Sequence, residues 1–368
     1  MKNKDKSVLI ISSLNKSASE EWALRVKDHL IENRFNVTIF DTYKQFEHMI
    51  KLDYLKLAPQ YFLNYFKKII KYKLKLQKYY PLLEEMYIRS VVIKNYLDSI
   101  SVSVVIYQNL EDMINFSEIK KEYVVVYTAP TIFSEEIKLN SNCDLRILST
   151  IRKLEDKVFK EANLIIFHWF SFFKLLKKLK KNISNKLMTV SWGCQKHSRQ
   201  SSFSMKPKII YIGKLNNEWV YPKLLEKIQQ KRGLTVDVFS YEIPDDRFKN
   251  LKYLGYLSNL NKISNYQFGL ITVDKDRLRM NGFSAKHLLY ISYGLPVLCP
   301  EWRRDKKLEP ATIYYNESNF KQVIDYYSNK KMWLKKHKAA LELAGKLTWD
   351  ETLKDLSEQL TRLTGDFN

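Results

Sequence analysis

The chain has 368 residues, of which 45% are hydrophobic and 14% aromatic. This composition excludes a mostly disordered protein, and the length predicts two domains rather than one. The formal net charge of +22 predicts an anionic partner: a membrane surface, a nucleic acid or a phosphorylated ligand.

The cysteines and the apolar runs indicate the compartment. Cys143, Cys194 and Cys299 form no C-x-x-C pair, which excludes a disulfide framework and a cysteine-rich zinc site and suits a reducing cytosol. No apolar run approaches the roughly 18 residues that span a bilayer, and the N-terminus lacks a signal-peptide pattern. We therefore expect a cytoplasmic protein without a membrane-spanning helix.

Short apolar runs alternate with amphipathic stretches in the first half of the chain. Strands are predicted at 8–12, 37–40, 102–107, 123–127, 164–167 and 188–191, and helices at 19–33 and 147–161. Residues 43–98, rich in Tyr, Phe, Leu and Lys, predict several further helices. The polar stretch 195–206 lacks aliphatic residues and predicts a linker.

The same alternation restarts after this linker. Strands are predicted at 208–212, 235–239, 251–253, 268–272 and 295–299, and helices at 221–230, 285–293, 321–347 and 350–363. Strands that alternate with helices in both halves predict two parallel, doubly wound α/β domains.

One window of the second half has the pattern of a nucleotide site. Residues 283–300, FSAKHLLYISYGLPVLCP, predict a loop with Ser284, a helix with Lys286 in its first turn, and a buried strand. Gly294 ends the helix because glycine accepts the left-handed backbone of a helix C-terminus. The free N–H groups and positive dipole end at the helix start suit a phosphate. The alternative is an ordinary crossover helix with a surface lysine.

Two upstream turns strengthen the prediction of a nucleotide site. Gly213 follows the strand at 208–212, where it allows close backbone approach to a ligand, and Lys214 can neutralise a phosphate. Gly255 and Tyr256 follow the strand at 251–253, where a planar base can rest on the backbone. In doubly wound sheets, ligands bind beyond the carboxyl ends of the strands.

The second half resembles the donor-binding domain of GT-B glycosyltransferases. The matching motifs are YIGKL (211–215), YLGYLSN (253–259), ISNYQFGLITV (263–273) and SAKHLLYISYGLPVL (284–298). The first half is similar to the acceptor domain of these enzymes over 153–178 and 188–195. Among them, the chain most resembles glucuronosyltransferases of bacterial exopolysaccharide assembly.

This resemblance implies the GT-B fold, in which two Rossmann-like domains face each other across a cleft. It implies an acceptor-binding domain over 1–200, a nucleotide-sugar-binding domain over 206–347, and a helix over 348–368 that returns to the first domain. The implied activity is transfer of a hexosyl or glycuronosyl group from a UDP-sugar to a lipid-linked saccharide in cell-surface polysaccharide synthesis, with no metal cofactor. The donor-binding residues are then Gly213, Lys214, Gly255, Tyr256, Ser284, Ala285, Lys286 and Glu301.

The donor helix departs from the family pattern at three positions. Leu289 and Asn281 stand where retaining enzymes carry two carboxylates, and Ala285 replaces a proline. We therefore expect transfer with inversion, and Glu301 is the candidate to hold the ribose or the sugar.

Inversion requires a base that accepts the proton of the acceptor hydroxyl. Glu135 and Glu136, in a predicted loop after the strand at 123–127, are candidates, and so is Asp112 after the strand at 102–107. His168 is a third possibility, but its aromatic neighbours favour a packed histidine. We expect Glu155 on the preceding helix to pair with other side chains of that helix or to face water.

A basic aromatic stretch, residues 51–80, contains eight lysines and one aspartate. It predicts a helix that lies on the anionic inner face of the cell membrane. The candidate contacts are Lys67, Lys68, Lys71, Tyr72 and Lys75, and a second cluster comprises Lys174, Lys177, Lys178, Lys180 and Lys181. A solvated helix face is the alternative. Nucleic acid is disfavoured because no recognised nucleic-acid motif accompanies the lysines.

Two other functions remain open at this point. A sugar-nucleotide epimerase of the same fold predicts several acids and histidines in the cleft, yet the chain has only six histidines. A non-catalytic basic protein that binds nucleic acid or an anionic glycan predicts no nucleotide affinity and strong loss of binding with salt.

Overall fold

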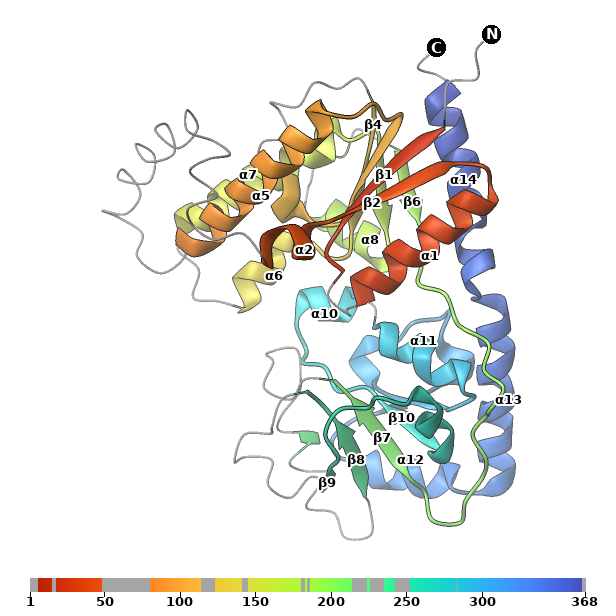
Figure 1. Ribbon diagram of the computed structural model, residues 1–368. Coiled ribbons are helices and arrows are strands. Elements are labelled where there is room, and N and C mark those ends of the chain that lie inside the picture. Colours follow the sequence, from red (N-terminus) through yellow and green to blue (C-terminus); the bar gives the residue numbers. More distant parts are fainter. Residues whose placement is uncertain are drawn as a thin grey trace. The chain divides into compact units, whose positions relative to one another are not determined.

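The computed structural model describes residues 6–14, 18–47, 80–113, 123–140, 145–179, 183, 186–213, 224–225, 235–241, 252–282 and 284–365 (Figure 1). The chain divides into two compact units. Unit 1 comprises Met1–Ser191 and Leu353–Asn368, and unit 2 comprises Trp192–Thr352.

Unit 1 is built on a six-stranded parallel sheet in the order β2-β1-β3-β4-β5-β6. Its strands are β1 (Ser7–Ser12), β2 (Asn36–Asp41), β3 (Val104–Tyr107), β4 (Val124–Ala129), β5 (Leu164–Phe167) and β6 (Lys186–Thr189). Every residue of β3, β4 and β5 is buried, as expected for apolar runs covered on both faces of a parallel sheet.

Helices cover both faces of this sheet. They are α1 (Ala18–Glu32), α2 (Thr42–Glu47), α5 (Tyr80–Asp98), α6 (Phe133–Asn140), α7 (Leu145–Glu161), α8 (Phe170–Lys178) and α14 (Trp349–Gly365), with a 3₁₀ turn, η1 (Leu110–Met113). Figure 1 shows α1 and α14 on one side of the sheet and α5 and α7 on the other. From Leu353 onward α14 belongs to unit 1, where Lys6 Nζ donates a hydrogen bond to Thr361 Oγ1.

Unit 2 contains a second six-stranded parallel sheet, in the order β12-β11-β10-β7-β8-β9. Its strands are β7 (Ile209–Ile212), β8 (Val236–Phe239), β9 (Lys252–Tyr253), β10 (Phe268–Leu270), β11 (Val297–Pro300) and β12 (Thr312–Tyr315). Successive strands extend from β7 to one side through β8 and β9, and to the other through β10, β11 and β12. The strand order therefore reverses between β7 and β10, and such a switch point is where doubly wound sheets bind ligands.

Helices and short 3₁₀ turns alternate with the strands of this sheet along the chain. They are α10 (Arg277–Asn281), α11 (Ala285–Ser292), α12 (Phe320–Tyr327) and α13 (Lys330–Lys346), with 3₁₀ turns η4 (Leu260–Asn265), η5 (Glu301–Arg303) and η6 (Glu309–Ala311). The polar segment before β7 contacts this unit, since Ser201 N–H donates to the Tyr293 carbonyl. Phe203 packs at 5.9 Å from the Trp333 ring.

The predicted fold class, two parallel doubly wound α/β domains, is confirmed. The prediction of one helix over 321–347 is wrong, because α12 ends at Tyr327 and α13 begins at Lys330. The Asn329 side chain accepts hydrogen bonds from the N–H groups of Lys331 and Met332, which starts a new helix. None of the helices in the described ranges is long and apolar enough to cross a membrane.

Candidate functional site

The switch point of unit 2 brings the end of β7 and the start of α11 together. Gly213 directly follows β7 and has a φ of +138°. A β-carbon on Gly213 would lie only 2.4 Å from Lys286 Nζ. The glycine and the lysine that the sequence predicts for one phosphate site are therefore neighbours.

Tyr290 fixes α11 against the sheet and so positions Lys286. Its hydroxyl accepts a hydrogen bond from Ile212 N–H at 3.0 Å. Gly269 in β10 leaves room for the Tyr290 ring, since a β-carbon there would lie 2.3 Å from a ring atom. Gly294 then ends the helix turn with a φ of +76°, as predicted. The helix is thus held to both strands that flank the switch point.

Two cations at this site lie close together in a partly desolvated environment. The pKa of Lys286 is lowered to about 8, first because burial removes water from its ammonium and then because the Arg303 guanidinium repels it. Arg303 Nη2 donates to the Gly282 carbonyl at 2.8 Å. Burial lowers the pKa of Arg303 as well, although Cys299 and the Asp305 and Asp276 carboxylates act in the opposite direction. Among the described residues, no carboxylate forms an ion pair with Lys286 or Arg303. This arrangement favours an anionic ligand that neutralises both charges.

Arg303 is the cation that sequence reasoning missed. It lies in η5, immediately after β11, within a run of charged residues that gives no local sign of burial. Its role follows only from the folding of η5 towards α10 and α11.

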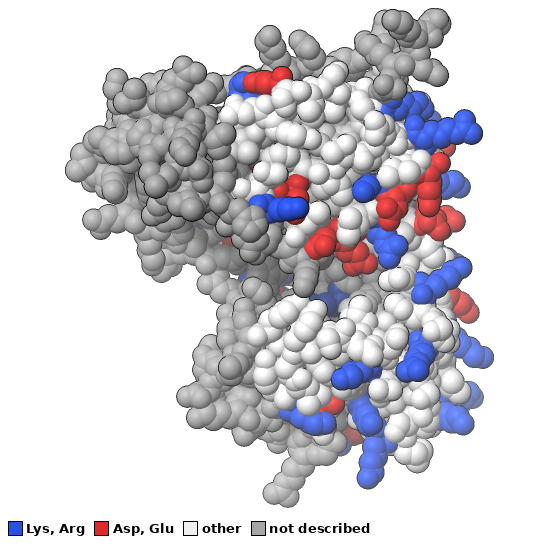
Figure 2. Space-filling view, viewed as in Figure 1, with Lys and Arg blue, Asp and Glu red and all other residues white. Residues whose placement is uncertain are grey.

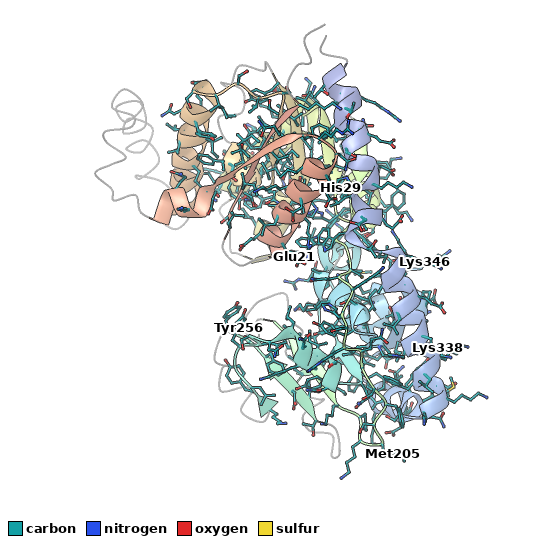
Figure 3. All side chains as sticks on the ribbon, turned by 45° about the vertical axis from the view of Figure 1, so that its right-hand side comes forward. Glu21, His29, Met205, Tyr256, Lys338 and Lys346 are labelled. Carbon is teal, nitrogen blue, oxygen red and sulfur yellow. The ribbon has the colours of Figure 1, made fainter. Side chains whose placement is uncertain are left out.

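Two exposed tyrosines stack at the carboxyl ends of β8 and β9. The ring centroids of Tyr241 and Tyr256 are 4.1 Å apart and the ring planes differ by 22°. Tyr256 follows Gly255, which has a φ of +73°, and projects from the loop after β9 (Figure 3). Exposed aromatic faces can stack on a nucleobase. Tyr256 is one of the predicted donor contacts, whereas Tyr241, two residues after the end of β8, is not.

The other predicted donor residues occupy separate positions. Ser284 and Ala285 are half-buried at the start of α11, and His287 N–H donates to the Ser284 carbonyl. Glu301 is exposed after β11, where its Oε2 accepts a hydrogen bond from Asn316 Nδ2 at 3.1 Å. Lys214 lies outside the described residues, as do the predicted membrane contacts Lys67, Lys68, Lys71, Tyr72 and Lys75.

Each candidate base in unit 1 has a different environment. Asp112 is buried and forms an ion pair with Arg89, whose Nε lies 3.0 Å from Asp112 Oδ1. Glu135 forms an ion pair with Arg152 at 3.3 Å. The loop predicted for Glu135 and Glu136 is instead the first turn of α6, where acidic side chains interact favourably with the helix dipole.

Glu111, which is not among the predicted bases, is a carboxyl group in the described part of unit 1 whose pKa is raised to near neutral pH. It lies in η1, after the carboxyl end of β3, next to Asp112. Its pKa is raised to about 7, mainly by burial and also by the Asp112 and Glu136 carboxylates, while a backbone hydrogen bond and the Arg89 guanidinium act in the opposite direction. A carboxyl group with this pKa can accept and release a proton near neutral pH.

Two further side chains in unit 1, His168 and Glu155, are buried and hydrogen-bonded within the unit. His168 is buried, its Nδ1 lies 3.1 Å from the Val190 carbonyl oxygen, and burial lowers its pKa to about 4. This agrees with the prediction of a packed histidine. The expectation that Glu155 faces water is wrong: it is buried and accepts a hydrogen bond from Ser134 Oγ at 2.6 Å. The fold of α6 onto α7 brings Ser134 to Glu155.

The described parts of the chain contain no group of three or more His, Cys, Asp or Glu side chains arranged to hold a metal ion.

We expect Gly213→Ala to weaken nucleotide binding. The new methyl group would displace the Lys286 ammonium, and a non-glycine residue at φ +138° is strained. UDP affinity should fall at least about tenfold, and the free energy of unfolding should fall by about 1–3 kcal/mol. Calorimetric titration and thermal unfolding measure these changes.

Gly345→Ala provides the matched control. Gly345 lies in α13 and a β-carbon there has no neighbour within 4 Å. This variant should bind UDP normally and gain about 0.5–1 kcal/mol of stability, because alanine favours a helix. UDP affinity that is equal in Gly213→Ala and the wild type would contradict the placement of Gly213 in the nucleotide site.

No protein-family model matches the chain, and no curated protein matches its sequence. Solved structures do match. Sucrose-phosphate synthase from Thermosynechococcus elongatus has a TM-score of 0.74 at 9% identity, over 98% of this chain and 100% of that one. HepE from Anabaena, in complex with UDP-glucose, has a TM-score of 0.65 at 12% identity, over 97% and 99%.

A third similar structure is trehalose-6-phosphate synthase from E. coli bound with UDP-2-fluoro glucose. Its TM-score is 0.64 at 8% identity, over 97% of this chain and 99% of that one. At these identities the similarity establishes the fold, which is the predicted GT-B fold.

Proposed function

We propose that the protein is a glycosyltransferase that transfers a hexosyl or glycuronosyl group from a UDP-sugar. The observation that carries this proposal is the pair of partly desolvated cations, Lys286 and Arg303, beside Gly213 at the switch point of unit 2. A nucleoside diphosphate supplies the anionic charge that such a site requires. The UDP-sugar complexes of two structurally similar proteins support this choice of ligand.

The proposed donor site has two parts with different tasks. Lys286 and Arg303 bind the diphosphate and stabilise the negative charge that grows on it as the bond to the sugar breaks. Tyr241 and Tyr256 provide aromatic faces for the uracil ring. Because Gly213 has no side chain, the phosphates can approach its backbone closely. Glu301 remains the proposed contact for the ribose or the sugar.

The chemical step is transfer with inversion. The acceptor hydroxyl oxygen forms a bond to the anomeric carbon while the bond from that carbon to the UDP oxygen breaks. The electron pair leaves with UDP, and the hydroxyl proton passes to a carboxylate. We propose Glu111 as this base, because its raised pKa suits proton transfer and because Asp112 and Glu135 are held in ion pairs. No metal ion has a role in this proposal.

For the acceptor we propose a lipid-linked saccharide in cell-surface polysaccharide synthesis, at the cytoplasmic face of the membrane. Its support is the high positive charge of the chain and its lysine-rich aromatic segments.

Calorimetric titration with UDP, UMP and GDP tests the donor proposal. We expect UDP to bind at micromolar to millimolar concentration and UMP to bind at least about tenfold more weakly, because UMP lacks the second phosphate. GDP should bind less tightly than UDP. Absence of binding by every nucleoside diphosphate would refute the proposed function.

A further inference from the structure

Helix α8 has an outward stripe of phenylalanine and lysine. Phe170, Phe173, Lys174 and Lys177 are spaced i, i+3, i+4 and i+7, so they share one helix face. The opposite face is buried in unit 1 through Phe172, Leu175 and Leu176. This packing holds the helix in place and leaves the stripe on the surface.

The exposed phenylalanine is the unusual member of this stripe. The Phe170 side chain is 57% exposed, and its ring centroid lies 5.8 Å from that of the half-buried Phe173. Lys174 Nζ lies 5.7 Å from the Phe170 centroid, and Lys177 Nζ lies 4.5 Å from the Phe173 centroid. Two apolar rings and their lysines therefore form one continuous patch, which the exposed Lys178 extends.

The stretch of sequence that contains α8 carries charge of one sign. No Asp or Glu occurs between Glu161 and Glu218, so α8 and the segments on either side contain no acidic residue. On the face drawn in Figure 2, acidic side chains are interspersed among the lysines and arginines. Exposed aromatic surface and lysines thus lie together on α8, and neither this helix nor the sequence that flanks it supplies an acidic residue.

We propose that α8 docks the protein on an anionic phospholipid bilayer. Phe170 and Phe173 insert at the boundary between headgroups and acyl chains, and Lys174, Lys177 and Lys178 contact the lipid phosphates. This proposal rests on the proposed function in one respect: a lipid-linked acceptor would be met at the membrane surface on which α8 docks.

The ring geometry favours a bilayer over a nucleic acid. A base that stacks on an aromatic side chain needs a free ring face. At α8 a lysine ammonium lies over each ring, and the two rings are tilted by 40°. A bilayer requires only apolar surface bordered by cations, and lysine stems can extend their ammonium groups to the headgroups.

Reversal of the three α8 lysines tests the docking surface. The variant Lys174→Glu/Lys177→Glu/Lys178→Glu is compared with Lys331→Glu/Lys335→Glu/Lys338→Glu, which changes three exposed lysines of α13. Figure 3 shows that Lys338 projects away from α13. Each variant lowers the net charge by six, from +22 to +16. Binding of the full chain to phosphatidylglycerol–phosphatidylcholine vesicles is measured by flotation.

We expect the α8 variant to bind these vesicles about a hundredfold more weakly than the wild type, since each of the three lysines near an anionic surface contributes roughly a fivefold factor. The α13 variant should stay within about threefold of the wild type. Equal losses in both variants, or no loss in the α8 variant, would overturn the proposal. Circular dichroism checks that both variants are folded.

A second pair of variants tests insertion of the ring. Phe170→Ser should weaken vesicle binding several-fold even in about 0.5 M salt, where surface charges are screened. Met205→Ser, which changes a loop side chain that is 85% exposed, should have no effect. Wild-type binding by Phe170→Ser would overturn the insertion.

Two further measurements separate this proposal from its alternatives. If the α8 variant loses affinity for a single-stranded oligonucleotide while its vesicle binding is unchanged, the partner is a nucleic acid and the proposal fails. UDP affinity, measured in parallel, should be unchanged in all four variants. A wild type that binds UDP but no anionic vesicle refutes the docking alone, and one that binds vesicles but no nucleotide refutes the proposed function alone.

Discussion

Lys286→Met is expected to weaken UDP binding strongly and to make the protein more stable. The ammonium group is partly desolvated and lies near Arg303, so without a ligand its charge destabilises the folded state. Methionine keeps most of the side-chain volume and removes the charge. We expect the free energy of unfolding at pH 7 to rise by about 1–3 kcal/mol. UDP affinity should fall about a hundredfold or more, because a charge-assisted contact to phosphate is lost.

The pH dependence of the wild type supplies a second measurement for Lys286. Its folded pKa, about 8, lies below its unfolded value. Between about pH 8 and pH 10.4 the unfolded chain therefore holds more protons, and the contribution of Lys286 makes stability rise with pH in this window. UDP binding needs the charged form, so affinity should fall as pH rises above 8, by at most about tenfold per pH unit.

Lys335→Met, which changes an exposed lysine of α13, is the control for both measurements. It should keep the UDP affinity and the stability of the wild type. A Lys286→Met variant that binds UDP normally would exclude Lys286 from the donor site. If Lys286→Met is less stable than the wild type, a partner stabilises the charge of Lys286 in the folded protein.

Glu111→Gln is expected to slow sugar transfer by about 10² to 10⁴-fold at unchanged UDP affinity, because glutamine cannot accept the hydroxyl proton. The rate of the wild type should rise as pH increases through about 7, the pKa to which burial raises Glu111. The variant should lose this dependence. The measurement is UDP release from the bound UDP-sugar, with water as the acceptor, over pH 5 to 9.

Stability gives an independent reading of Glu111. Its folded pKa is raised, so between about pH 4.5 and pH 7 the folded state holds more protons than the unfolded state. The contribution of Glu111 therefore makes stability fall as pH rises through this window, and Glu111→Gln should be more stable than the wild type at pH 8.

Asp112→Asn is the contrasting variant. It removes the buried carboxylate whose Oδ1 lies 3.0 Å from Arg89 Nε, so its main effect should be a loss of stability. Normal turnover by Glu111→Gln, together with a large catalytic loss in a folded Asp112→Asn, would reverse the assignment of the base.

Much of the fold follows from short stretches of sequence. Apolar runs such as Leu164–Phe167 predict buried parallel strands, and the amphipathic pattern over 147–161 predicts the helix observed as α7. The break between α12 and α13 was not predicted. The apolar pattern by itself predicts one continuous helix, but the Asn329 side chain accepts hydrogen bonds from Lys331 and Met332 and so starts a new helix there.

The sequence by itself determined the alternation of strands and helices, the backbone freedom of Gly213 and Gly294, and the place of Lys286 at a helix start. These properties depend on neighbouring residues, because hydrophobic periodicity and glycine dihedral angles are local. Only the tertiary structure decided which charged groups act together. Arg303 lies near Lys286, and Arg89 forms an ion pair with Asp112 and not with Glu111. Neither fact can be predicted from local sequence, because desolvation and Coulomb interactions depend on distances between elements that are remote in sequence.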